Sequence, residues 1–294
     1  MKDKYKLVFL IGAARSGTKL VRTILEQSEN ISVIPYDMNY IWKYGNYNVP
    51  HDELNDIELS EKEKKFIKNY IDKQQQKTKS PIIVEKTVSN CLRVDFIKKI
   101  FPDAKIIHLY RDGRDVALSA KDRWEGNLFD KEQQSKKDIF KKLLDLPLLA
   151  VMPYLLNYIK INVKHIFSTK SSSVESWGPI YNGIDIDKDK YSLLELCSLQ
   201  WKKSVESTLK SLSKLKEGEE YINIKYEDLL SSTNDEVKKL VDFINIQDSE
   251  KLFDYCDKNI RSKNMNKWTN LEKTEIDKIE LIEKDTLTKL GYKI

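Results

Sequence analysis

A glycine pair near the N-terminus has the spacing of a phosphate-binding loop. Gly12 and Gly17 stand five positions apart in "LVFLIGAARSGTKLVRTILEQ", as in the nucleotide-binding pattern G-x-x-x-x-G-K-[ST]. A glycine-rich turn that leads into a helix directs backbone N–H groups and the positive end of the helix dipole at a bound anion. Four side chains add positive charge and hydroxyl donors around this turn: Arg15, Ser16, Thr18 and Lys19.

The last two residues of the loop argue against a metal-bound nucleotide. ATPases place a lysine first and a hydroxyl second, and that hydroxyl holds Mg²⁺. Here Thr18 comes first and Lys19 takes the metal-binding position. For the glycines alone, a tight turn with incidental charges is the alternative, but an apolar stretch before the loop and a helical pattern after it favour a phosphate site.

A second stretch, "AKIIHLYRDGRDVALSAKDRW", carries another set of anion-binding side chains. Arg111 directly follows an apolar run, and Ser119 and Arg123 are four residues apart, so they share one face of a helix. Such a set can bind a second phosphate. The alternative is a salt-bridged surface turn, in which Arg111 and Arg114 pair with Asp112 and Asp115. Taken together, two phosphate sites after two strands predict a nucleotide with phosphates at both ends of its ribose.

The elements that must position these residues follow an α/β pattern. Short apolar runs alternate with segments of helical period, which is typical of a mainly parallel sheet covered on both faces. The sequence therefore predicts an α/β, P-loop-like, three-layer α/β/α fold with a central mainly parallel sheet and helical insertions over the active site. The expected strands are 6–12, 81–86, 104–110 and 219–226, and the expected helices include 19–27, 90–101, 114–124 and 194–212.

Two further helices are expected to open with capping boxes and complete the pattern. Thr233 with Glu236, and Thr269 with Glu272, have the required spacing, and the last helix is expected to end at Gly291.

Composition sets the class of protein. The chain has 294 residues, 40% hydrophobic and 33% charged, with a formal net charge of +5, which suits an anionic ligand but does not indicate nucleic acid. We expect a single domain over 1–294, with variable acceptor-binding insertions at approximately 38–80 and 125–190. Cys91, Cys197 and Cys256 have no metal-ligand spacing, so we expect free thiols, no disulfide, no metal and a cytoplasmic location.

Two apolar segments could suggest a membrane. The run after the N-terminal lysines flows directly into the glycine loop and is interpreted as a strand rather than a signal peptide. The stretch 143–159 contains Asp145, Pro147 and Pro153, which favours a buried or groove-lining helical segment over a span. Peripheral contact with a membrane stays open, as does the oligomeric state.

These motifs resemble the sulfotransferases that use 3′-phosphoadenosine 5′-phosphosulfate (PAPS). "FLIGAARSGTKLVRTIL" is similar to their 5′-phosphosulfate loop and "IIHLYRDGRDVALS" to their 3′-phosphate motif. The resemblance extends through "VEKT", "INIKYEDLL" and "MNKWTNLEKTEIDKIELIEKDTLTKLGY". In detail it is closest to the branch that contains tyrosylprotein sulfotransferases and bacterial sulfotransferases of saccharides.

The resemblance implies roles for particular residues. Arg15 and Lys86 would be catalytic cations, because charge that builds on the leaving phosphate needs fixed positive groups. No metal is implied, and the product would be adenosine 3′,5′-bisphosphate (PAP). The cofactor-binding residues implied are Gly12, Ala14, Arg15, Ser16, Gly17, Thr18, Lys19, Arg111, Ser119, Arg123, Tyr226 and Lys267.

The general base departs from the family pattern. Tyrosylprotein enzymes have a glutamate after the second strand, and Tyr36 stands at that position here, with Asp37 next to it. We predict Asp37 as the base that takes the acceptor's proton; its alternative is an ordinary turn residue after a proline. Glu85 and His51 are the other candidates, whereas His108 is expected to be a core residue.

The acceptor is expected to bind over the irregular segments. Aromatic side chains in them can stack on sugars or pack as core: Trp42, Tyr44, Tyr47, Trp124, Trp177 and Tyr181. "ESWGPIYNG" and "DMNYIWKYGN" resemble segments of bacterial carbohydrate sulfotransferases of surface-polysaccharide pathways, which favours a saccharide hydroxyl over another hydroxyl acceptor. The alternatives are a P-loop kinase or NTPase, and a non-catalytic nucleotide-binding protein of the same fold.

Overall fold

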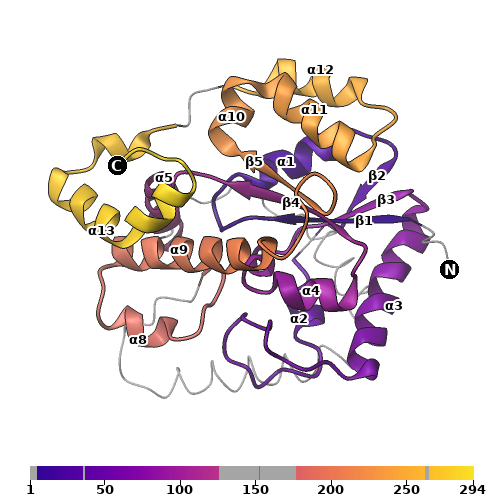
Figure 1. The fold of residues 1–294 in the computed structure, drawn as a ribbon, viewed down its shortest axis with the longest axis horizontal. Coiled ribbons are helices and arrows are strands. Elements are labelled where there is room, and N and C mark those ends of the chain that lie inside the picture. Colours follow the sequence, from indigo (N-terminus) through magenta and orange to yellow (C-terminus); the bar gives the residue numbers. More distant parts are fainter. Residues whose placement is uncertain (1–4, 36, 126–151, 153–176, 262–264) are drawn as a thin grey trace.

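The protein is built on a parallel sheet whose strands all point the same way. The computed structural model describes residues 5–35, 37–125, 152, 177–261 and 265–294. The sheet has the strand order β2-β3-β1-β4-β5 (Figure 1), and each neighbouring pair is parallel. Its strands are β1 (Lys6–Ile11), β2 (Ile31–Val33), β3 (Ile82–Glu85), β4 (Lys105–Tyr110) and β5 (Tyr221–Lys225).

Alternation along β1 builds two cores, one on each face of the sheet. Phe9 and Ile11 belong to one buried cluster, and Val8 and Leu10 belong to the other, as expected from the two-residue period of a strand. Both faces are covered by helices, so the predicted three-layer α/β/α fold is confirmed.

Each face of the sheet is covered by helices from both halves of the chain. In Figure 1 one group lies above the sheet and the other below it. The cluster around Val8 includes side chains of α1 (Thr18–Leu25), α10 (Tyr226–Ser231), α11 (Thr233–Ile244) and α12 (Glu250–Asn259). The cluster around Phe9 includes side chains of α2 (Asn39–Trp42), α3 (Glu61–Thr78), the 3₁₀ helix η1 (Val88–Leu92), α4 (Val94–Ile100) and α9 (Leu193–Leu212).

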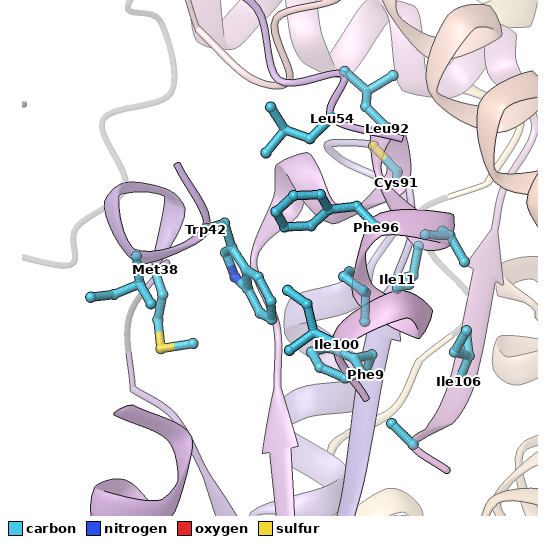
Figure 2. Close-up of a cluster of buried hydrophobic side chains, with 14 of the residues drawn as sticks. Phe9, Ile11, Met38, Trp42, Leu54, Cys91, Leu92, Phe96, Ile100 and Ile106 are labelled. Carbon is cyan, nitrogen blue, oxygen red and sulfur yellow. The ribbon is translucent and has the colours of Figure 1, made fainter. Parts of the chain in front are cut away.

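Large side chains fill the space between β1 and the helices of the lower layer. Figure 2 shows Phe9 and Ile11 of the strand with Trp42 and Phe96 from the helices that cover it. The Phe9 and Trp42 rings meet edge to face with centroids 5.7 Å apart. This packing anchors Trp42, five residues after Asp37, against the sheet.

A group of helices lies beyond the ends of the strands. The helix α5 (Gly113–Trp124) packs against α9 and against α13 (Lys273–Lys289), through small clusters centred on Trp201 and Ala117. The short α8 (Ile184–Lys188) precedes α9, and the 3₁₀ helix η2 (Lys267–Asn270) precedes α13. This group carries Ser119, Arg123 and Lys267.

The four predicted strands are confirmed and helices follow them, but the helix expected over 90–101 is divided at Arg93 into η1 and α4. Two helices also begin differently from what the sequence predicts. Neither predicted capping box forms. Thr233 is the first residue of α11 and its hydroxyl donates to the Leu229 carbonyl at 2.8 Å. Thr269 lies within η2 and its hydroxyl donates to the Asn266 carbonyl. Both threonines lie inside a helical turn, and the residues that stand at the N-cap positions of α11 and α13 are Ser232 and Glu272.

Capping boxes form at three other places among the described residues, and one of them, Glu272 with Glu275, opens α13 three residues beyond the predicted Thr269. Ser60 with Glu63 opens α3, and Ser192 with Glu195 opens α9. His108 is buried in β4 as expected, where its Nδ1 lies 2.8 Å from Asn223 Oδ1 and burial lowers its pKa to about 4. No helix among the residues described is long and apolar enough to cross a bilayer. The stretch 143–159, apart from residue 152, and most of the expected insertion 125–190 lie outside the described residues.

Candidate functional site

Every strand of the sheet is followed closely by a residue of the predicted site. Because all strands run in one direction, their carboxyl ends meet at one edge, where ligands bind in open α/β sheets. The residues that follow are Arg15 in the loop after β1, Asp37 after β2, Lys86 after β3, Arg111 after β4 and Tyr226 after β5.

These residues line one cavity of about 810 Å³. The structure therefore brings together the two motifs that the sequence separates by almost a hundred positions. The predicted residues that line the cavity are Ala14, Arg15, Gly17, Thr18, Lys19, Asp37, Lys86, Arg111, Ser119, Arg123, Tyr226 and Lys267. Gly12 and Ser16 do not line it; Ser16 is fully buried and its hydroxyl finds no hydrogen-bond partner in the part of the chain that the structure describes.

Close backbone packing shapes the loop after β1. A Cβ on Gly12 would lie 2.5 Å from the carbonyl oxygen of Leu109 in β4, so only glycine fits there. Gly17 has φ +98°, and a Cβ on it would lie 2.4 Å from the ring of Tyr226. Arg15 also has a positive φ, 69°. The loop is therefore pressed between β4 and the residue that follows β5, with Arg15 at its outer bend.

The two predicted phosphate-binding motifs are in direct contact. Arg15 Nε donates to Ser119 Oγ at 3.0 Å, and Arg111 Nη1 donates to the Arg15 carbonyl at 3.4 Å. Positive charge from both motifs thus faces a single space. The sequence argument for two phosphates on one ligand requires this arrangement.

Arg111 is held by an acidic and an aromatic neighbour. Its Nη2 donates to Asp115 Oδ2 at 2.9 Å, and its guanidinium carbon lies 4.5 Å from the centroid of the Tyr226 ring. The salt-bridged turn and the phosphate site, stated as alternatives for this stretch, therefore coexist: Arg111 pairs with Asp115 and still lines the cavity. Arg114, which does not line the cavity, pairs instead with Asp112.

Lys86 and Asp37 form an ion pair at the wall of the cavity. Lys86 Nζ lies 3.5 Å from Asp37 Oδ1, and the Asp37 side chain is 49% exposed. The two segments are tied together one residue further on, where the Met38 N–H donates to Thr87 Oγ1 at 2.8 Å. A cation and a carboxylate that meet at the open side of an anion site can serve as electrostatic stabiliser and proton acceptor.

The other two base candidates lie away from the cavity. Glu85 is fully buried, where Thr87 Oγ1 and Asn90 Nδ2 donate to its two oxygens, and burial raises the pKa of this carboxyl to about 7. His51 does not line the cavity, and its Nδ1 is buried. Tyr36 lies outside the described residues.

The aromatic residues divide between core and cavity. Trp42 and Tyr181 are core residues, 0% and 1% exposed, and Tyr44 stacks on Phe66 with centroids 3.8 Å apart. Trp124 is partly buried against core clusters, and Tyr47 meets Tyr44 edge to face. Trp177 lines the cavity.

Several polar residues that line the cavity were not predicted. They are Arg22, Thr23, Glu26, Asn39, Thr87, Ser89, Asp115 and Asp122. Helical spacing could have indicated the first three, because they follow Lys19 at intervals of three, four and seven residues, with Arg22 and Thr23 on α1 and Glu26 as its C-cap. No sequence signal marks Asn39 or Ser89, which the path of the chain brings to the cavity.

Comparison with known proteins agrees with this fold. Residues 8–139, which carry both motifs, match the model of the sulfotransferase family. No curated protein sequence matches the chain. Among solved structures, the sulfotransferase domain from the curacin biosynthetic pathway is 14% identical with a TM-score of 0.55, and the match covers 99% of each chain.

Two further structures share the architecture. Sulfotransferase STF9 from Mycobacterium avium is 11% identical with a TM-score of 0.59, over 99% of this chain and 78% of that one. The sulfotransferase domain from the Synechococcus PCC 7002 olefin synthase is 15% identical with a TM-score of 0.51, over 97% of both chains. At these identities the likeness shows the fold.

Proposed function

We propose that this protein is a sulfotransferase that moves a sulfuryl group from PAPS to a hydroxyl of an acceptor, by in-line displacement. The observation that carries the proposal is the junction of the two motifs: the loop after β1 and the arginine after β4 open into one cavity and touch through Arg15, Ser119 and Arg111. The family match over residues 8–139 supports the same activity.

The chain's own groups fit a ligand with phosphates at two positions. The loop residues Arg15 to Lys19 would hold the 5′ end, through backbone N–H groups at the start of α1 and the cations beside them. Arg111, Ser119 and Arg123 would hold the 3′-phosphate, and Tyr226 and Lys267 would complete the site. The loop is packed too tightly for a Cβ at Gly12, which agrees with a preformed anion cradle.

The mechanism assigns two roles to three residues at the cavity. When bound, PAPS supplies the activated sulfuryl group. Asp37 would take the proton of the acceptor hydroxyl. At the same time the hydroxyl oxygen forms its bond to sulfur, and the bond between sulfur and the phosphate oxygen breaks. Arg15 and Lys86 place fixed positive charge where negative charge collects on that departing oxygen, which favours the transition state over the ground state.

We further propose a saccharide acceptor. Asn39 and Ser89, whose side chains can hydrogen-bond, line the same cavity as Lys86, and so does Trp177. Sugars bind through many hydroxyl hydrogen bonds together with an aromatic ring against one sugar face. A purely phenolic acceptor would call for a mostly apolar wall.

Binding of PAP tests the cofactor assignment without knowledge of the acceptor. Calorimetry in EDTA is expected to show tight PAP binding, weaker AMP binding, and no PAP binding to Arg111→Ala. Binding of Mg·ATP in place of PAP would overturn the proposal and favour a kinase or NTPase. Transfer of label from ³⁵S-PAPS to a panel of glycans then tests catalysis; PAP binding without transfer to any acceptor would favour a non-catalytic protein.

A further inference from the structure

Asp115 presents an electrostatic puzzle at the proposed 3′-phosphate site. It lines the cavity beside Arg111, yet a carboxylate close to a bound phosphate repels it. Its side chain is only 2% exposed. A buried carboxylate is retained in such a place only where its charge is compensated and its oxygens are fully used.

Three donors surround this carboxylate, and they come from two distant parts of the chain. Arg111 Nη2 donates to Oδ2 at 2.9 Å. The backbone N–H of Asn266 donates to the same oxygen at 2.9 Å, and the N–H of Trp268 donates to Oδ1 at 3.1 Å. Lys267, the residue between those two N–H groups, lines the cavity.

Other contacts hold the side of the segment 265–270 that faces away from the cavity. The Arg114 guanidinium carbon lies 3.8 Å from the centroid of the Trp268 ring, and Arg114 also pairs with Glu280 of α13 at 2.7 Å. Asn266 has a positive φ of 56°, so the chain bends sharply where it meets Asp115. The segment 265–270 therefore depends on α5 for its position, and Asp115 is the contact on the cavity side.

We propose that Asp115 is a positioning residue for nucleotide binding: it holds the Arg111 guanidinium and the backbone on either side of Lys267 in one arrangement, so that both cations face the 3′-phosphate. This inference rests on the proposed function. It assigns Asp115 a favourable effect on the binding of an anion, although the residue is itself an anion.

The sign of one substitution separates positioning from simple charge. If Asp115 acted only through its charge, Asp115→Ala would strengthen PAP binding, because a repelling carboxylate would be gone. Positioning predicts the opposite: loss of hydrogen bonds to a charged group weakens PAP binding by about tenfold or more. AMP lacks the 3′-phosphate, so its affinity should stay within about twofold, and the preference for PAP over AMP should fall.

Asp122 provides the matched control. It is a carboxylate on the same helix that lines the same cavity, and no bond joins it to the described part of the segment 265–270. Asp122→Ala should leave PAP affinity unchanged or raise it. Asp115→Asn keeps the shape and one carbonyl acceptor, so it should fall between the wild type and Asp115→Ala; it also serves if the alanine variant does not fold.

The experiment measures PAP and AMP binding by calorimetry in EDTA for the full-length wild type, both Asp115 variants, Asp122→Ala, Lys267→Ala and Asp115→Ala/Lys267→Ala. Positioning of Lys267 by Asp115 predicts that the two losses of PAP affinity are smaller together than their sum. Additive losses, or equal PAP affinity in Asp115→Asn and Asp122→Ala, would overturn the inference while the proposed function stands. Failure of the wild type to bind PAP would instead overturn the proposed function.

Discussion

At the scale of single residues, the proposed chemistry depends on the pair formed by Lys86 and Asp37. They come from different strand ends and meet at 3.5 Å, which places one cation and one carboxylate at the open side of the cavity. In the proposed mechanism neither residue is required for the nucleotide to bind through its 3′-phosphate, since that end is held by Arg111 and its neighbours.

The first prediction concerns turnover. Lys86→Ala and Asp37→Asn should each lower kcat by about a hundredfold to a thousandfold, as loss of a preorganised charged group does elsewhere. Asp37→Asn should leave the Kd for PAP nearly unchanged. The measurement is sulfuryl transfer from ³⁵S-PAPS to the acceptor that serves the wild type, with PAP calorimetry alongside.

Glu26→Gln is the control for this prediction, because Glu26 also lines the cavity and pairs with Arg22 at 2.9 Å. It should retain turnover within a few-fold of wild type. Equal loss of activity in Glu26→Gln and Asp37→Asn would mean that the cavity needs its carboxylates only for charge balance, and Asp37 would lose its role as base.

Glu85 gives a second prediction, on stability and pH. Burial raises its pKa to about 7 in the folded protein, above the ordinary value of about 4.3 for a glutamate in an unfolded chain. Between these values the folded state holds a proton that the unfolded state has released, so this residue's contribution to stability is lost as pH rises. The expected loss is of the order of 3 kcal/mol between pH 4.5 and 7.

Urea unfolding across pH 4.5 to 8 measures this effect as the difference between wild type and Glu85→Gln. The glutamine variant has no such titration, so its stability should gain on that of wild type as pH rises. Two curves that stay parallel would show that Glu85 is already ionised in the folded protein, and that Thr87 and Asn90 compensate its buried charge.

At the scale of elements, strands were easier to predict than the elements around them. A strand buried on both faces is a continuous apolar run, such as "LVFLI" and "KIIHLY", and this pattern survives in sequence. The helix Glu61–Thr78 is mostly polar and buries only Ile67, Tyr70 and Ile71, so periodicity did not reveal it. The capping boxes were misplaced because a Thr-x-x-Glu spacing does not show whether the hydroxyl faces a free N–H or a carbonyl.

The sequence could not predict the contacts in the site between residues that lie far apart along the chain. The residue types after β1 and β4 indicated phosphate binding, and the spacing gave Arg111, Ser119 and Arg123. The contacts of Asp115 with the segment 265–270 were hidden, because its partners Asn266 and Trp268 are 151 and 153 positions away. Local pattern suggested only a pair with Arg111.

The third prediction tests how the loop after β1 is held. Gly17→Ala should destabilise the protein and abolish PAP binding, for two reasons: φ +98° is unfavourable for alanine, and its Cβ would meet the Tyr226 ring at 2.4 Å. Gly183 separates the two causes, since it has φ +95° and a Cβ on it would meet nothing within 4 Å among the described residues. Gly183→Ala should cost only the backbone strain, about 1–2 kcal/mol.

Thermal unfolding and PAP calorimetry of both variants provide the measurement. A larger loss of stability in Gly17→Ala than in Gly183→Ala would show that contact between the loop and the residue after β5 matters beyond backbone conformation. If the two variants lost equal stability and both bound PAP, the loop would have room to shift, and the preformed cradle would be wrong.

At the scale of the whole molecule, the proposed ligand joins the sheet to the C-terminal segment. Arg15 and Arg111 follow strands at the centre of the sheet, whereas Lys267 lies in η2 and is followed by α13, which packs on α5 and α9 (Figure 1). The sequence predicts a single domain over the whole chain. A ligand held by both parts offers a test of that prediction, because it should stabilise them together.

Differential scanning calorimetry with PAP is that test. If the chain unfolds as one cooperative unit, PAP at a hundred times its Kd should add about 2.7 kcal/mol to the free energy of unfolding, and the single transition should rise by roughly 4 °C. Arg111→Ala should show the same single transition without the rise. Two transitions, of which PAP moves only one, would divide the chain into separately folding parts and place the nucleotide in one of them. In that case Lys267 would belong to the part that binds PAP only if Lys267→Ala abolished the rise in transition temperature.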